Sequence, residues 1–222
     1  MEKRNQVTEI SMDMARNMGL AAEKSFPNSK HVIDRFHVVR LVMDAVQHIR
    51  INLRWKAIED ENIAIKQAKQ NGEKYYSPIL ANGDTLKELL VRSRYLLYKY
   101  ETDWTANQAK RAAILFEKYP ALKTAYQLTL TFRNIYKNAS KTQALIEFNN
   151  WKQKVITAQI DEFNTVVNSI DHHLDNIMNF FDNRSTNANA ESFNSKIKGF
   201  RANLRGVTDV KFFLFRLEKL FA

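Results

Sequence analysis

Apolar residues recur at three- and four-residue steps over most of the chain beyond Asp34. One such stripe lies within residues 38–53, and another steps 3-4-3-4-3-4 from Ile160 to Phe181. This spacing places the apolar side chains on one face of a helix. The second stripe is more simply explained by packing within a bundle than by a dimeric coiled coil. Further helices are expected at about 105–118, 121–137 and 141–158, with Pro120 at one junction, and on an apolar face at 210–221.

The first 34 residues follow a different pattern. Residues 7–12 and 31–33 are rich in β-branched and apolar types, and each segment runs directly into an aspartate, Asp13 or Asp34. Residues 14–25 between them predict a helix that stops at a Phe-Pro-Asn turn. Functional groups of an open α/β sheet gather at the carboxyl ends of its strands. Two strands cannot bury both faces of a sheet, so we expect them to pair with preceding strands or with another element.

Two polar segments interrupt the helical pattern. Residues 71–84 contain Asn-Gly and Ser-Pro and predict a loop, after which Asp84 or Thr85 caps a helix that extends to Leu97. Residues 182–187 are polar as well. A helix is expected to begin after them, near Ala188, and to run through Glu191.

Composition narrows the fold class to a mainly α chain with a small α/β part. Of 222 residues, 45% are apolar, whereas only 5 are Gly and 3 are Pro, too few for the tight turns of an all-β domain. Cys is absent, which excludes disulfides, zinc–thiolate sites and cysteine nucleophiles. No apolar run is long enough to span a bilayer.

Charge points to a polyanionic partner. Lys and Arg number 34 and Asp and Glu 24, giving a net charge of +10 and a pI near 9.7. Such a balance raises the odds of nucleic-acid binding, although a basic protein without a nucleic-acid partner explains the charge about as well.

Three acids stand out as candidate metal ligands: Asp13, Asp34 and Glu191. Hard divalent cations prefer carboxylate oxygens with water and phosphate completing the shell, and such carboxylates hold the ions of two-metal phosphoryl transfer. On spacing alone, a structural interpretation is stronger. Asp after a strand often caps a helix, and Glu in a first helical turn complements the helix dipole.

Two sequence boxes add information. The first comprises residues 7–14, Phe26-Pro27 and the run Val32-Ile-Asp-Arg-Phe-His-Val-Val39. The second comprises Asn-Arg-Ser-Thr-Asn at 183–187, Ala-Glu at 190–191 and Asn-Ser-Lys-Ile-Lys at 194–198. Together, and in this order around a long helical stretch, they resemble bacterial insertion-sequence transposases of the DDE type, in the ISL3 group. The resemblance covers essentially the whole chain.

The resemblance implies a partial ribonuclease-H-like core with a helical insertion. It assigns residues 1–39 to the core, 40–180 to the insertion and 181–222 to the C-terminal core helices. Asp13 matches the second catalytic acid and Glu191 the third, each holding Mg²⁺ or Mn²⁺. Asp34 and His37 match a supporting Asp-x-x-His signature, and Asn187 lies beside Glu191 as a further supporting residue.

The first catalytic Asp of the family has no counterpart here. The chain therefore resembles the C-terminal part of a transposase, and whether it is itself an enzyme stays open. The complete enzyme would cleave DNA at the element's ends and join them to a target, and the cofactor is expected only there. We expect this chain alone to be inactive in a Mg²⁺ or Mn²⁺ nuclease assay; robust cleavage lost in Asp13→Asn would contradict this.

The expected partners are DNA, both transposon ends and target, and a second copy in a homodimer. No membrane contact is expected, and the localisation is bacterial cytoplasm at the nucleoid. The candidate DNA-binding residues are Arg184, Lys196, Lys198, Arg201 and Arg205. For Arg184 the alternative role is a helix cap, and for the other four it is a solvated helix surface.

An alternative from another class is a non-catalytic basic helical module that binds DNA or dimerises, with Asp13 and Glu191 as caps. The adjacent His172 and His173 are expected on different helix faces and do not predict a metal pair. Trp55, Trp104 and Trp151 lie in mostly apolar helical settings and are expected in the core.

Overall fold

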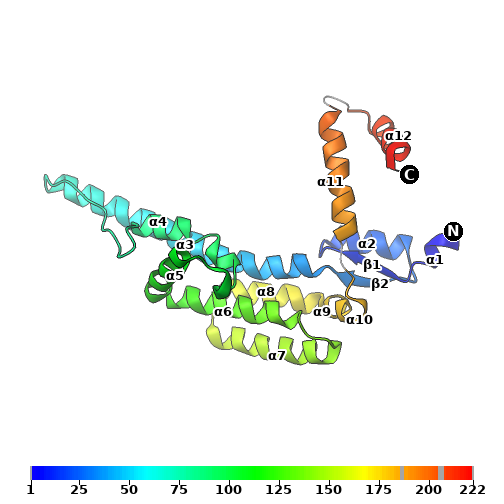
Figure 1. Cartoon of the computed structure of the whole chain (residues 1–222), viewed down its shortest axis with the longest axis horizontal. Coiled ribbons are helices and arrows are strands. Elements are labelled where there is room, and N and C mark those ends of the chain that lie inside the picture. The colour runs from blue at the N-terminus through cyan, green and yellow to red at the C-terminus, as the bar shows by residue number, and fades with distance from the viewer. Residues whose placement is uncertain (1, 186–187, 205–207, 222) are drawn as a thin grey trace.

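The computed structural model describes residues 2–185, 188–204 and 208–221, leaving out the side chains of 2–3, 188–191 and 221. The chain is mostly helical, at 73%, with one small parallel sheet. This confirms the expected mainly α composition with a small α/β part. The sheet lies at one end of an elongated helical bundle (Figure 1).

The strand–helix–strand unit predicted for the first residues is present. A short helix α1 (Glu2–Asn5) leads into β1 (Glu9–Met12), α2 (Arg16–Ser25) and β2 (Lys30–Ile33). The strands pair in parallel, with Met12 opposite Ile33. Within the described residues the sheet has these two strands only. Met12, Val32 and Ile33 are buried, and the other strand residues stay at least partly exposed. A helical crossover between parallel strands matches the geometry that such pairing requires.

The bundle is organised around one long helix, α3 (Arg35–Gln70). The helices α6 (Pro120–Ile135) and α8 (Asp161–His172) pack along α3, and α7 (Lys141–Ala158) packs on α6. At its centre Trp151 is 0% exposed and donates a hydrogen bond from its indole N–H to the carbonyl of Leu128 at 2.9 Å. Phe132 and Phe148 surround the indole, with ring centroids at 4.8 and 5.8 Å. Aromatic rings at these spacings contribute contact energy beyond area burial.

Threonine caps begin two of the shorter helices. Thr85 and Glu88 form a capping box at the start of α4 (Leu86–Arg92), and Thr105 and Gln108 form another at α5 (Ala106–Lys118). Each box satisfies two backbone N–H groups that the helix start leaves unpaired. The helix predicted to reach Leu97 ends earlier, and two 3₁₀ turns follow, η1 (Leu96–Tyr98) and η2 (Glu101–Asp103).

The single helix predicted over 160–181 is wrong in its continuity. The segment divides into α8, α9 (Leu174–Met178) and α10 (Phe180–Asn183). The breaks fall at His173 and Asn179, between the stripe positions, so the apolar stripe still faces the core. Periodicity therefore identified the buried face but could not show the interruptions.

Two helices complete the chain, α11 (Ala188–Asn203) and α12 (Val210–Phe221). Figure 1 shows α11 extending away from the bundle, with α12 beyond it. Phe200 and Phe213 stack between the two helices at 5.9 Å. No helix of the described residues is long and apolar enough to cross a membrane.

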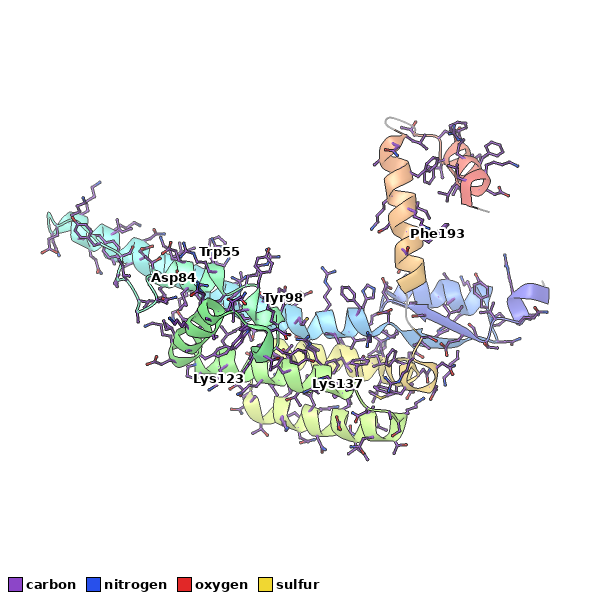
Figure 2. All side chains as sticks on the ribbon, viewed as in Figure 1. Trp55, Asp84, Tyr98, Lys123, Lys137 and Phe193 are labelled. Atoms are coloured by element: carbon purple, nitrogen blue, oxygen red, sulfur yellow. The ribbon has the colours of Figure 1, made fainter. Side chains whose placement is uncertain are left out.

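The tryptophan prediction is wrong for one residue of three. Trp151 is buried and Trp104 packs against the core, but Trp55 is 61% exposed on α3 (Figure 2). The guanidinium of Arg54 lies 5.8 Å from its ring centroid. The hydrophobic stripe of α3 narrows over its second half, because that half of the helix extends beyond α6 and α8 (Figure 1).

Asp84 anchors the loop that precedes α4. Its side chain is buried and forms ion pairs with Arg92 and with Arg111 of α5, the latter at 2.8 Å. Burial alone would raise the pKa of Asp84, but the hydrogen bonds from Arg111 and Arg92 hold it below its ordinary value. The carboxylate thus joins the loop, α4 and α5 through charge-assisted bonds.

We expect Asp84→Asn to destabilise the fold by about 3 kcal/mol near neutral pH, because it removes the counter-ion of Arg111 and one of the two carboxylates that pair with Arg92. A depressed folded-state pKa contributes stability above the unfolded value, which is lost as pH falls through the folded one. The difference between wild type and variant should therefore shrink at about pH 3. Urea unfolding followed by circular dichroism at both pH values measures it.

Asp44→Asn is the matched control. Asp44 is exposed on α3 and pairs with Arg40 at 3.5 Å, so its loss should cost less than about 1 kcal/mol. Equal effects of the two substitutions, or a difference that does not depend on pH, would contradict the assigned role of Asp84.

Candidate active site

The two aspartates that follow the strands stand at the same edge of the sheet. Met12 and Ile33 are paired in register, and each is followed by the aspartate in question. The backbone N–H of Asp34 donates to the carbonyl of Met12 at 2.8 Å, which continues the ladder to the strand ends. The edge predicted from the sequence is therefore present, but the two side chains have different surroundings.

Asp34 is a buried helix cap. It is 4% exposed, and its Oδ1 accepts a hydrogen bond from the backbone N–H of Phe36 at 2.6 Å, at the start of α3. The backbone N–H of His37 donates to the Asp34 carbonyl at 3.2 Å. The ring of His37 stands edge-on to that of Phe36, with centroids 5.6 Å apart. These contacts fix where α3 leaves the sheet.

Asp13 instead lines an open cavity of about 630 Å³. Its Oδ1 accepts a hydrogen bond from the backbone N–H of Ala15 at 2.8 Å. Among the described residues, no group donates a hydrogen bond to the other carboxylate oxygen of Asp13. The side chain is partly exposed. The other polar residues around the cavity come from α2, β2 and the α8–α9 junction: Arg16, Glu23, His31, His172, His173 and Asn176.

The sequence pattern did not predict that His172 and His173 lie together at this cavity. His172 ends α8, and His173 has non-helical backbone angles of φ −112° and ψ 13°. Because the helix breaks there, the two rings approach edge to face at 4.7 Å and both line the Asp13 cavity. Burial, and secondarily the neighbouring His172, lowers the pKa of His173. No feature of the sequence signals this break, since the apolar stripe continues through it.

The start of the second sequence box ties α10 to its neighbours. Asn183 donates to a carboxylate oxygen of Glu9 on β1 at 2.9 Å, and Asp182 pairs with Lys30 on β2. The hydrogen bond from Lys30 holds the pKa of Asp182 below its ordinary value. Arg184 adopts a left-handed backbone conformation, φ 54°, and its guanidinium donates to the carbonyls of Tyr136, at 3.5 Å, and of Asn138. These contacts hold the segment that leads to α11.

The remaining predicted residues lie on α11 or around it. Glu191 belongs to that helix, but its side chain lies outside the described ones, as do Asn187 and Arg205. The expected proximity of Asp13 and Glu191 is therefore untested. Lys196, Lys198 and Arg201 are exposed on α11. Within the described side chains, no group of three or more His, Asp or Glu residues is arranged to hold a metal ion.

Comparison with known proteins bears on this site. A family model for transposases, that of the ISL3 group of DDE transposases, matches residues 1–217. The chain belongs to this transposase family. The match confirms the resemblance carried by the two sequence boxes and supports DNA as the partner of this transposase. No curated protein and no solved structure matches the chain.

The cap at Asp34 makes a direct prediction. Asp34→Asn should change the free energy of unfolding by only a few tenths of a kcal/mol, because Asn accepts the same backbone hydrogen bond, whereas Asp34→Ala should cost about 1–2 kcal/mol. Denaturant unfolding of the two variants measures this. If Asn proves as destabilising as Ala, the negative charge rather than the cap is what the fold requires there.

Proposed function

We propose that this transposase uses Asp13 and Glu191 as the second and third acids of a ribonuclease-H-like centre for metal-dependent DNA cleavage and strand transfer. The observation that carries the proposal is the position of Asp13. Asp13 follows a paired parallel strand and lines an open cavity. One of its carboxylate oxygens accepts no hydrogen bond from the described residues. Family membership supports the transposase role, and the assignment of each acid is our inference.

The donors at the cavity fit a hard divalent cation. Asp13 offers a carboxylate oxygen, the ligand that Mg²⁺ prefers, and Mg²⁺ typically takes one or two protein carboxylates while keeping several waters. An open cavity leaves room for those waters and for a phosphate. Asp13 and Glu191 would hold the ion. When bound, such an ion supplies Lewis-acid stabilisation of the charge on the transferring phosphoryl group.

Protein groups around Asp13 can orient the DNA. The imidazoles of His31, His172 and His173 line the same cavity, and a neutral imidazole offers one hydrogen-bond donor and one acceptor. The lowered pKa of His173 favours that neutral form near pH 7. His173 can therefore donate to a phosphate oxygen or accept from a water without adding a cation beside the carboxylate.

The basic residues of α11 extend the proposed contact. Lys196, Lys198 and Arg201 are exposed on α11, the helix that also carries Glu191. Contacts of these cations with DNA phosphates would therefore be made from the same helix as the proposed metal ligand. Arg184 contributes differently. Its guanidinium is already engaged with two backbone carbonyls, which suits a role in positioning α11 more than a free phosphate contact.

The domain division and the assembly are part of the proposal. We infer a core of residues 1–39, an insertion of 40–180 and C-terminal core helices of 181–222. Because α3 runs through residues 39 and 40, this boundary falls inside one helix. A homodimer and association with the bacterial nucleoid follow from a DNA-recombination role and remain proposals of the same kind.

A second function is favoured by one contact. The hydrogen bond from the Ala15 N–H to Asp13 is what a purely structural turn before α2 would make. On that basis the chain would be a non-catalytic basic helical module that binds DNA or dimerises. The two functions differ in what the Asp13 charge does, because Asn keeps the turn and removes the charge.

In a complete transposase that contains this chain, Asp13→Asn should therefore leave the free energy of unfolding nearly unchanged. It should weaken Mn²⁺ binding by about tenfold or more, because even residues that only orient a metal ligand cost that much when they are replaced. Electron paramagnetic resonance of free Mn²⁺ measures binding. The same substitution, and Glu191→Gln, should reduce transposition to background in cells carrying an element whose transposase contains this chain.

Asp44→Asn and Glu218→Gln are the matched controls, being exposed acids of the same types on α3 and α12. Both should retain Mn²⁺ binding and transposition. If Asp13→Asn binds Mn²⁺ as the wild type does and supports transposition, the catalytic assignment is wrong and the structural turn is the role of Asp13.

A further inference from the structure

A second cavity, of about 350 Å³, lies where α3 begins and α6 ends. Three cations and three aromatic residues dominate its lining: Arg35, Arg133, Lys137, Phe36, Tyr100 and Tyr136. No carboxylate of the described residues lines it. Nothing in the family match assigns a role to this cavity, and its composition is unlike that of the Asp13 cavity.

The cations are held in place by aromatic rings and backbone. The guanidinium of Arg133 lies 4.0 Å from the centroid of Tyr100 and donates to the carbonyl of Tyr98 at 3.1 Å. The ammonium of Lys137 lies 4.9 Å from the same centroid. Arg35 lies over the ring of Phe180 at 5.9 Å. Such contacts orient a cation without neutralising it.

Within the part of the chain that the structure describes, the cations of the cavity have no direct carboxylate partner. Among the described residues, none of the three cations forms an ion pair within 4.0 Å. The acids adjacent in sequence, Asp34 and Glu101, do not line the cavity. Three oriented cations around one concave space favour an anion that makes several contacts at once.

The aromatic residues indicate more than a bare phosphate. Phe36 is 56% exposed at the cavity, and its ring stands edge-on to that of His37 with the centroids 5.6 Å apart. Tyr136 forms a buried wall, and its hydroxyl has no hydrogen-bond partner in the part of the chain that the structure describes. An exposed ring beside cations is the combination that binds single-stranded nucleic acid, with bases stacking and phosphates pairing.

The cavity adjoins the candidate active site through β2. Ile33 lines the Asp13 cavity, Arg35 lines the second one, and the buried Asp34 stands between them. The linings of the two cavities therefore come within two residues of each other along the chain. Figure 2 shows Lys137 at the end of α6 nearer the sheet, and Lys123 near the opposite end.

We propose that this cavity binds an unpaired segment of a DNA strand, with phosphates on Arg35, Arg133 and Lys137 and a base stacked on Phe36. The proposal rests on the proposed function, because it assigns a DNA contact to the same transposase. Duplex DNA would reach the cations but could not present a base face to Phe36.

The test is fluorescence anisotropy with a labelled single-stranded oligonucleotide and its duplex, over a series of salt concentrations. The double variant Arg133→Gln/Lys137→Gln should weaken single-strand binding by about tenfold and reduce the salt slope by about 0.7 for each lost contact. Phe36→Leu should weaken single-strand binding about tenfold, as expected for one stacked base, and leave duplex binding within about twofold.

Lys123→Gln is the control on α6, the helix that carries Arg133. Lys123 is an exposed cation outside the cavity, and its replacement should change either affinity by less than about twofold. Lys137→Arg keeps the charge and should keep the binding. Thermal unfolding of each variant identifies any that fail to fold. If the double variant fails to fold, Lys137→Arg and the surface change Phe36→Leu still test the proposal.

Three results would overturn the proposal: an equal loss for Lys123→Gln, an equal effect of Phe36→Leu on single strand and duplex, or displacement of the oligonucleotide by polyglutamate at matched charge. The last would identify an acidic protein segment as the better ligand. Failure here is separable from failure of the active-site assignment, because Mn²⁺ binding through Asp13 does not depend on Phe36.

Discussion

The whole arrangement depends on how the chain passes from β2 into α3 at Asp34. The backbone N–H of this residue completes the parallel ladder on Met12, and its carboxylate begins the helix by accepting from Phe36. One buried residue thus terminates a strand and orients a 36-residue helix. The helices α4, α6 and α8 pack on α3, so the direction set at Asp34 helps to decide where they lie relative to the sheet.

The return path of the chain closes the same junction from the other side. Asn179, between α9 and α10, donates to the carbonyl of His31 at 2.8 Å, and Asn183 reaches Glu9. The two ends of the bundle, α3 and α10, are therefore both fixed to the two-stranded sheet. This explains how residues about 140 positions apart in sequence, such as His31 and His172, come to line one cavity.

Sequence patterns predicted the fold where the controlling forces are local. Strand segments, the caps at Thr85 and the buried stripe to Phe181 follow from side-chain periodicity and end chemistry. The break at His173, and with it the histidine pair beside Asp13, depends on packing of α9 against β2, which no local pattern encodes. Exposure of Trp55 likewise depends on how far α3 outruns its neighbours. The position of Asp13 at the end of a strand was predicted from the sequence, whereas its catalytic role and the proximity of Glu191 remain predictions.

The distribution of charge says more about function than the net value does. The net charge of +10 does not say which cations are paired, as Arg92 and Arg111 are with Asp84. The cations of α11 and of the cavity at Tyr100 are instead left without carboxylate partners within the described residues, and those at Tyr100 are held by rings and carbonyls. Unpaired like charges repel, which costs stability. The three cations around the cavity at Tyr100 face one concave surface, which suits an anionic polymer, and the exposed ring of Phe36 adds the proposed preference for accessible bases over duplex.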